Sequence, residues 1–252
     1  MAINSKIGGR DMKIIYIPFK FKFKRDIIIN LTIIGIFLFL LIMVNKDGQL
    51  DVLNQFTLNP IYKGNENMSQ VAFECNVVWG TEYVPQMLDI LRDKNVKITF
   101  FIGGQWAEEN PELLKRMVEE GHEIGNHGYA HKHHAQLSFE ENIREIQRTE
   151  QIIEEITGVK TVLFAPPYGE FNKTTLQAAD ALGYKTIMWS IDTIDWRREG
   201  TDIILKRVLK NPHNGAFILM HPTEYTVEAL PIMIDELRAR GYEVGTISEL
   251  LK

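Results

Sequence analysis

From Val71 to the C-terminus, short apolar runs alternate with longer amphipathic runs, and this alternation restricts the fold more than any other feature of the chain. The short runs have the length of buried strands, and the longer runs carry apolar residues at helical spacing. The predicted strands are residues 71–78, 96–102, 122–126, 161–164, 185–189, 216–219 and 242–244. The predicted helices are residues 84–94, 111–120, 138–157, 173–182, 202–209 and 227–240. This repetition favours an α/β fold, a distorted (β/α) barrel of about seven parallel strands.

The N-terminal part of the chain has the composition of a membrane anchor. Residues 27–44 form a run of 18 uncharged residues, close to the minimum of about 17 that spans the hydrocarbon core as a helix. Seven basic residues and one acidic residue lie within residues 1–25, and the run ends without a small-residue cleavage pattern. The sequence therefore predicts a single-pass protein of the cell membrane. Its parts are a cytoplasmic basic segment (1–26), an uncleaved transmembrane anchor (27–44), a stalk (45–59) and an outer domain (60–252).

Charge and cysteine content narrow the classes of partner. The chain has a net charge of -5, and the N-terminal 25 residues carry +6 (seven basic minus one acidic), which leaves -11 on the rest. An acidic domain is repelled by the phosphate backbone, so no nucleic-acid partner is expected. The single cysteine, Cys75, cannot form an internal disulfide and is predicted to pack in the core.

Polar residues collect where the predicted strands end, which is where barrel enzymes place their catalytic groups. His127 and His131 are four residues apart just after a strand, a spacing at which two imidazoles can bind one divalent metal ion. His133 and His134 follow in a polar loop and are expected in solvent. The other polar residues at strand ends are Asn76, Tyr168, Asp192, Asp195 and His221. This combination indicates a metal-dependent hydrolase.

These motifs resemble, in order and spacing, those of the polysaccharide deacetylases of carbohydrate esterase family 4, the NodB homology domain. The resemblance covers roughly residues 60–252. Residues 127–131 are similar to the family's H-[ST]-x-x-H motif, and residues 165–169 (APPYG) are similar to R-P-P-Y-G with Ala165 in place of Arg. The remaining matches are D-x-x-D-W at residues 192–196, L-x-H at residues 219–221, and T-F-D-D at residues 74–77, which read ECNV.

The resemblance implies a role for each matching residue. His127 and His131 would be ligands of a divalent metal, with zinc as the implied ion. His221 would be the general acid, and Asp192 would hold its imidazole in orientation. The backbone N–H of Tyr168 would help to stabilise the oxyanion.

The first motif lacks both of the family's carboxylates. Asn76 stands where the family has its general base, and an amide has no proton affinity to offer at neutral pH. Val77 stands where the family has a carboxylate ligand, so zinc should be bound weakly and at partial occupancy, with the Asn76 carbonyl oxygen as a candidate further ligand. Glu74 projects to the same strand face as Asn76 and is a candidate replacement for the missing carboxylates. Ala165 removes the Arg that would pair with the base.

Three aromatic residues near the strand ends are candidates either to stack on sugar rings or to cap the barrel: Trp79, Tyr168 and Trp196. The resemblance implies an N-acetylated glycan, such as peptidoglycan or chitin oligomers, as the partner and hydrolysis of its acetamide C–N bond as the reaction. With the first motif altered, we expect a polysaccharide deacetylase-like protein of impaired turnover. The alternative is a catalytically inactive module that binds glycan or serves as a scaffold.

Overall fold

The structure is a computed structural model that describes residues 4–7, 10–13, 31–37, 39 and 58–252. The chain divides into two units, residues 1–57 and residues 58–252. In the first unit, β1 (Asn4–Ile7) pairs antiparallel with β2 (Arg10–Lys13), and residues 31–37 are helical. None of the helices among the described residues has the length and apolarity needed to cross a bilayer. Much of the predicted anchor, residues 27–44, and most of the predicted stalk lie outside the described residues, so both stay predictions.

The second unit is built on one sheet in which every pair of neighbouring strands is parallel. Seven strands follow the order β7-β6-β5-β4-β3-β9-β8, and β10 pairs with the beginning of β3. The sheet curls into a half-barrel with β7 and β8 as its edges, which confirms the α/β class and is consistent with the predicted distorted barrel. The strands are β3 (Gln70–Val77), β4 (Thr99–Ile102), β5 (Glu123–Asn126), β6 (Leu163–Phe164), β7 (Lys185–Thr186), β8 (Ile191–Asp192), β9 (Phe217–Met220) and β10 (Glu243–Gly245).

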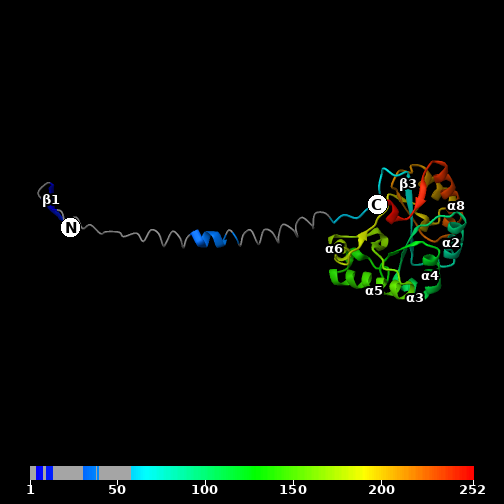
Figure 1. Ribbon diagram of the computed structural model, residues 1–252, viewed down its shortest axis with the longest axis horizontal. Helices are drawn as coiled ribbons and strands as arrows, with labels where there is room; N and C mark the ends of the chain where they lie inside the picture. The colour runs from blue at the N-terminus through cyan, green and yellow to red at the C-terminus, as the bar shows by residue number, and fades with distance from the viewer. Residues whose placement is uncertain (1–3, 8–9, 14–30, 38, 40–57) are drawn as a thin grey trace. The chain divides into compact units, whose positions relative to one another are not determined.

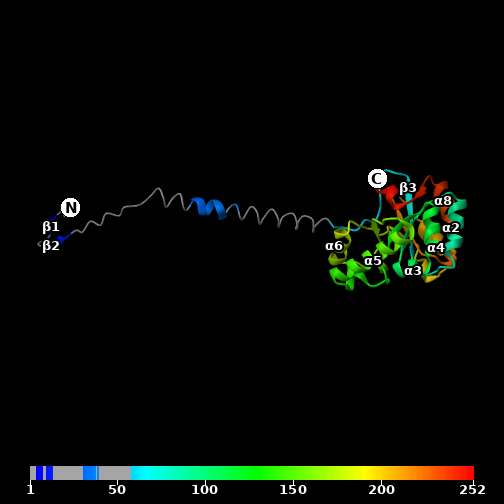
Figure 2. The ribbon, with the colours of Figure 1, turned by 60° about the horizontal axis from the view of Figure 1, so that its bottom comes forward.

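Helices surround this sheet, and Figures 1 and 2 show the longer ones around the outside of the domain with β3 among them. Apolar side chains of α2, α4, α5 and α8 pack against the outward face of the strands in one large core cluster. The helices are α2 (Val84–Asp93), α3 (Gly104–Glu109), α4 (Pro111–Glu119), α5 (Phe139–Thr157), α6 (Lys173–Ala181), α7 (Thr201–Leu209), α8 (Glu224–Ala239) and α9 (Ile247–Leu250).

The two faces of β3 have different surroundings, which decides where its polar residues lie. The cluster beneath the helices contains Val71, Phe73, Cys75 and Val77. This confirms the prediction that Cys75 packs in the core. Ala72 belongs to a second apolar cluster that fills the interior of the half-barrel. Because side chains alternate along a strand, Glu74 and Asn76 share the interior face with Ala72.

The predicted ends of α5 are confirmed. Ser138 accepts a hydrogen bond from the Glu141 N–H, and the Glu141 side chain accepts one from the Ser138 N–H, so the two form a capping box. Gly158 ends the helix in the left-handed conformation, with φ of +74°.

Helices α3 and α9 and strand β8 are absent from the sequence prediction, and strand β7 is shorter than predicted. Helices α3 and α9 have six and four residues, too short to show a helical period. The predicted strand 185–189 ends at Thr186, because the chain then crosses between the edges of the half-barrel. It joins the other edge at Ser190, whose N–H donates to the Phe217 carbonyl of β9 at 3.1 Å. The short strand β8 follows directly.

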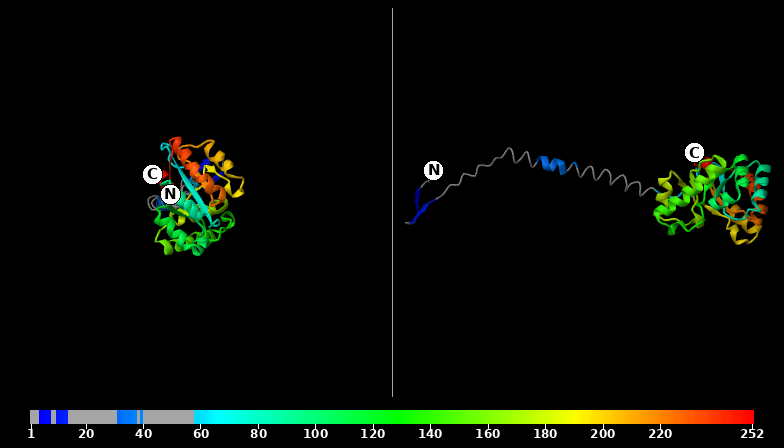
Figure 3. Two further views of the ribbon diagram at one scale, coloured as in Figure 1. Left: turned by 90° about the vertical axis from the view of Figure 1, so that its right-hand side faces the viewer. Right: turned by 90° about the horizontal axis from the view of Figure 1, so that it is seen from below.

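The C-terminal residues lie beside the segment that leads into β3, as both views of Figure 3 show. The Asn65 N–H donates to the Leu250 carbonyl at 2.8 Å, and a Cβ at Gly64 would lie 2.5 Å from the same carbonyl oxygen. This close backbone approach requires glycine at position 64.

Candidate functional site

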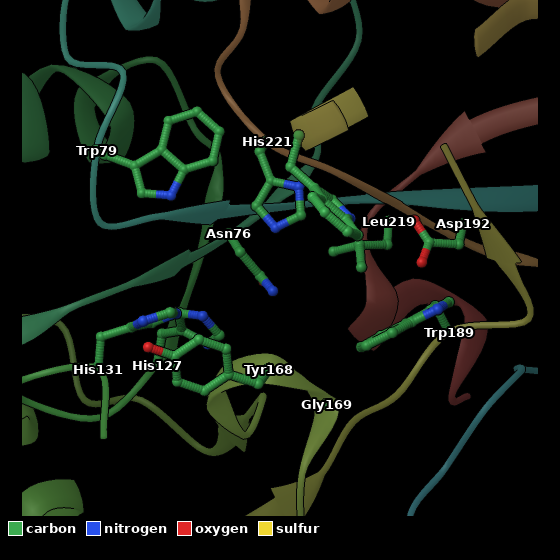
Figure 4. Close-up of a pocket in the computed structure, with 11 residues that line it drawn as sticks. Asn76, Trp79, His127, His131, Tyr168, Gly169, Trp189, Asp192, Leu219 and His221 are labelled. Atoms are coloured by element: carbon green, nitrogen blue, oxygen red, sulfur yellow. The ribbon is translucent and has the colours of Figure 1, made fainter. Parts of the chain in front are cut away.

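A cavity of about 410 Å³ opens at the carboxyl ends of the strands (Figure 4). Every predicted site residue except Glu74 lines it, although the residues come from widely separated parts of the chain. The lining residues are Asn76, Trp79, His127, His131, Tyr168, Gly169, Trp189, Asp192, Trp196, Leu219 and His221.

His127 and His131 lie side by side on one wall of this cavity, with 5.2 Å between their ring centroids. His127 follows β5 and is buried, and its Nδ1 lies 2.7 Å from the carbonyl oxygen of Ala165. A carbonyl oxygen only accepts, so Nδ1 carries the proton and Nε2 is left as an acceptor. Burial and the neighbouring imidazole lower the pKa of His127 well below its usual value, and burial lowers the pKa of His131 to about 4. Both rings are therefore neutral at neutral pH.

His221 is held by Asp195, and the prediction that Asp192 holds it is wrong. The Nδ1 of His221 lies 2.8 Å from Oδ1 of Asp195, and the His221 backbone N–H donates to Oδ2 at 2.6 Å. Strand β8 ends at Asp192, and Ile194 then adopts a left-handed φ of +51° that turns the chain back toward β9. This turn places the carboxylate of Asp195, rather than that of Asp192, beneath the imidazole.

Asp192 instead contributes a carboxylate to the cavity wall (Figure 4). Its Oδ1 accepts a hydrogen bond from the Ile194 N–H at 2.8 Å. Burial raises the pKa of Asp192, and the hydrogen bond from Ile194 opposes that effect.

Asn76 and Val77 point to different environments. Asn76 is 5% exposed and lies among the groups of the cavity, and its Oδ1 has no hydrogen-bond partner. Val77 is fully buried in the core beneath the helices and does not line the cavity. At the two positions where the resemblance implies carboxylates, the chain thus has an amide in the cavity and a methyl-bearing side chain in the core.

The described residues do not fit a catalytic zinc. Such an ion takes three protein ligands and an open position, whereas the cavity offers the imidazoles of His127 and His131. No group of three His, Cys, Asp or Glu side chains that could hold a metal ion occurs in the part of the chain that the structure describes. The unpaired Oδ1 of Asn76 is a neutral and weaker oxygen ligand than a carboxylate.

Glu74 lies one layer below Asn76 on the interior face, as predicted, but it does not complete a metal site. It is 1% exposed, it is absent from the cavity wall, and neither carboxylate oxygen has a hydrogen-bond partner. Burial, together with the negative charge of Asp192, raises the pKa of Glu74 well above its usual value. The charge of Asp192 thus acts on Glu74, and burial favours the protonated form of Glu74.

Aromatic rings form much of the cavity mouth. Trp79 stacks on His221 with 5.6 Å between the ring centroids and 7° between the planes. Tyr168 is 54% exposed, has a left-handed φ of +61°, and lies 4.4 Å from His131 and 4.1 Å from His133 between centroids. Trp196 is 51% exposed. Trp196 and the part of Tyr168 that His133 does not cover are therefore available for stacking.

The expectation that His133 and His134 lie in solvent is half wrong. His133 is exposed, yet it stacks on Tyr168 at 10° and its Nδ1 lies 2.9 Å from a Glu170 carboxylate oxygen. His134 is fully buried, and its Nδ1 lies 2.7 Å from Oδ1 of Asn142 in α5. Burial lowers the pKa of His134. The polar loop thus folds inward because α5 offers a buried polar partner.

Sequence reasoning missed two residues of the site. Trp189 lines the cavity, but within a predicted strand its apolar ring looked like core. Asp195 lies at a predicted strand end, but the resemblance implies Asp192 as the partner of His221. The D-x-x-D spacing could have raised both carboxylates as partners of His221, but it could not decide between them.

The fold and the cavity define the class of protein: an α/β half-barrel with its polar site at the carboxyl ends of parallel strands. Residues 63–187 match the polysaccharide deacetylase family. A peptidoglycan-N-acetylglucosamine deacetylase of Bacillus cereus is 34% identical over 196 residues, which make up 76% of this chain and 71% of that protein. The chain therefore belongs to the polysaccharide deacetylase family.

Two further relatives are more similar in sequence. The uncharacterized protein YlxY of Bacillus subtilis is 44% identical over 192 residues, and this chain spans only 60% of its length. The crystal structure of BA3943 from Bacillus anthracis, a family 4 pseudoenzyme, has 44% sequence identity and a TM-score of 0.76, covering 78% of this chain and 70% of that one. A mutant of BA3943 is described as having restored enzymatic activity.

Proposed function

We propose that this chain acts on or binds an N-acetylated cell-wall glycan in the cavity, with hydrolysis of the acetamide C–N bond impaired. Membership of the polysaccharide deacetylase family supports the glycan, and the Bacillus cereus relative is named for peptidoglycan N-acetylglucosamine. The exposed rings of Tyr168 and Trp196 support binding, because aromatic faces stack on sugar rings.

The single observation that carries the impairment is the amide at the end of β3. A general base must accept a proton from the attacking water, and the Asn76 side chain cannot do so at neutral pH. His221 keeps the arrangement of a proton donor, because Asp195 fixes its Nδ1 and leaves Nε2 as the free ring nitrogen. Loss of a base alone lowers a rate by roughly 10²- to 10⁴-fold.

The second candidate is a protein that binds glycan without turnover, or that serves as a scaffold. The specific support is the likeness to BA3943, which is named a pseudoenzyme and has 44% identity. The two candidates share the cavity and differ only in whether the amide bond is cleaved.

We also propose that residues 27–44 anchor the protein in the cell membrane with the domain on the outer side. The support is the uncharged run of 18 residues behind a basic segment. This location would place the cavity next to cell-wall glycan.

The experiment measures acetate release from N-acetylglucosamine oligomers by the purified full chain, with and without added divalent metal. The Asn76→Asp variant is assayed beside it. Slow or undetectable release by the unmodified chain and faster release by the variant would support the proposal. Metal-dependent deacetylation by the unmodified chain at the rate of the variant would overturn the impairment. Failure of both to release acetate or to bind the oligomers would overturn the glycan as partner.

A further inference from the structure

Among the described residues, those that line the cavity include one carboxylate and no cationic side chain. Asp192 lines the cavity, and neither lysine nor arginine does. The positive charge of Arg207 lowers the pKa of Asp192. The Arg207 guanidinium, however, donates to the Thr193 carbonyl at 2.9 Å and pairs with Glu199. Arg207 is therefore engaged outside the cavity, and the charge of the cavity wall is negative.

The neutral groups of the cavity add hydrogen-bond acceptors. His127 presents Nε2 as an acceptor, because its Nδ1 donates to Ala165. Asn76 lies between the two histidines and His221 in Figure 4, and its Oδ1 is unpaired. A half-turn of the amide exchanges Oδ1 and Nδ2, so Asn76 can direct its oxygen into the cavity.

Aromatic rings supply the third feature. Trp79, Tyr168, Trp189 and Trp196 all line the same cavity. The face of an aromatic ring attracts a cation within about 6 Å of its centroid, and tryptophan does so most strongly.

We propose that the cavity binds the protonated amine of an N-deacetylated glucosamine residue in the glycan, with the Asp192 carboxylate as its counter-ion. This inference rests on the proposed function for the presence of a glycan, and it names the sugar that is bound. A primary ammonium has three N–H donors and no acceptor, so it can donate to the Asp192 carboxylate without leaving an acceptor of its own unpaired. The side of the cavity opposite Asp192 carries the two imidazoles and the Asn76 amide (Figure 4). A neutral acetamide has a single N–H donor and no charge, so it gains less from Asp192. The cavity that does not fit zinc thus accepts a singly charged cation that the sugar itself carries.

The experiment is calorimetric titration of the full chain with a glucosamine tetramer and with an N-acetylglucosamine tetramer, at pH 6 where the amine is protonated. We expect the glucosamine tetramer to bind about tenfold more tightly, as a charge-assisted hydrogen bond contributes. The Asp192→Asn variant keeps the oxygen that accepts from Ile194 and should lose this preference while still binding the acetylated tetramer. The matched control is Asp180→Asn, an exposed carboxylate of α6 outside the cavity, which should leave the preference unchanged.

Four outcomes separate this inference from the proposed function. A preference that disappears in the Asp192→Asn variant alone supports the inference. Binding of the acetylated tetramer as tightly as, or more tightly than, the glucosamine tetramer overturns it and leaves the proposed function standing. Binding of neither tetramer overturns both. A preference that survives in the Asp192→Asn variant assigns the amine to another group and also overturns the inference.

Discussion

Asp195 holds His221 through both of its carboxylate oxygens: Oδ1 meets the ring Nδ1 at 2.8 Å, and Oδ2 accepts the backbone N–H at 2.6 Å. The Thr226 hydroxyl of α8 donates to the same Oδ2 at 2.6 Å. Asp195 is 1% exposed, so three donors replace the water that its charge would otherwise bind. The contact joins the end of β9, the turn after β8 and the start of α8.

The first prediction is that Asp195→Ala lowers the free energy of unfolding by about 3 kcal/mol or more, because it leaves the buried donors of His221 and Thr226 without a partner. Asp192→Ala, at the half-buried neighbour, should cost about 1 kcal/mol. Urea denaturation of both variants measures the difference. Equal losses would show that Asp195 is no more important to this part of the fold than Asp192.

The second prediction concerns Glu74, whose two carboxylate oxygens are buried without partners. Its pKa is raised in the folded protein, so folding favours the protonated form. Below the ordinary carboxyl pKa of about 4.3, Glu74 is protonated in both states and the free energy of unfolding is not reduced. As the pH rises from there toward the raised folded pKa, the free energy of unfolding falls. Glu74→Gln cannot ionise, and should therefore be more stable than the unmodified chain at pH 8, by about 1–3 kcal/mol, with no such gain at pH 4.

The measurement is the free energy of unfolding of Glu74→Gln and the unmodified chain between pH 4 and pH 8. Glu119→Gln on the exposed part of α4 is the control and should follow the unmodified chain at every pH. A stability difference between Glu74→Gln and the unmodified chain that does not change with pH would contradict a raised pKa.

The core of the fold could be predicted because its signals are local. The capping box of Ser138 and Glu141 and the left-handed Gly158 are readable in the sequence, since a cap depends on residues within one turn of the helix. The outward and inward faces of β3 follow from alternation alone. The meeting of His127, Asp192 and His221 in one cavity follows from the parallel sheet, because parallel strands bring their carboxyl ends to one edge.

The parts that could not be predicted depend on turns. The choice between Asp192 and Asp195 as partner of His221 is made by the positive φ of Ile194, an isoleucine conformation that no period or propensity indicates. The burial of His134 depends on Asn142, eight residues away in α5, and on the lack of a Cβ at Gly128, where the His134 ring approaches the backbone. Neither relationship is visible in spacing.

The third prediction follows from Gly128, which has a φ of +72° and would place a Cβ 2.7 Å from the Nε2 of buried His134. Gly128→Ala therefore combines backbone strain of about 1–2 kcal/mol with a steric clash against a ring that Asn142 fixes. Gly183→Ala is the matched control, because Gly183 has a φ of +78° and nothing within 4 Å of its Cβ position. Thermal unfolding should show Gly128→Ala to be the less stable of the two by about 1 kcal/mol or more. Equal destabilisation would mean that the loop moves His134 away without cost.

The fourth prediction concerns zinc. In the unmodified chain His127 and His131 are the two imidazole ligands available, and Val77 turns into the core, so 100 µM zinc should raise the melting temperature by less than about 1 °C. The double variant Asn76→Asp, Val77→Asp puts one carboxylate in the cavity at position 76, and zinc binding draws the second, at position 77, out of the core toward the two imidazoles. Without metal it should be several kcal/mol less stable, because an aspartate at position 77 replaces a fully buried valine.

Zinc should restore part of that loss, since a ligand that binds only the folded state adds about 2.7 kcal/mol at a hundred times its dissociation constant. The melting temperature of the double variant should therefore rise by several degrees in 100 µM zinc, which differential scanning fluorimetry measures. The same variant with His131→Ala is the control and should lose the rise, because it removes one imidazole from the site and leaves both new carboxylates in place. A rise in the unmodified chain as large as that in the double variant would mean that two imidazoles and the Asn76 oxygen already bind zinc tightly, and that the substitutions at 76 and 77 do not weaken the metal site.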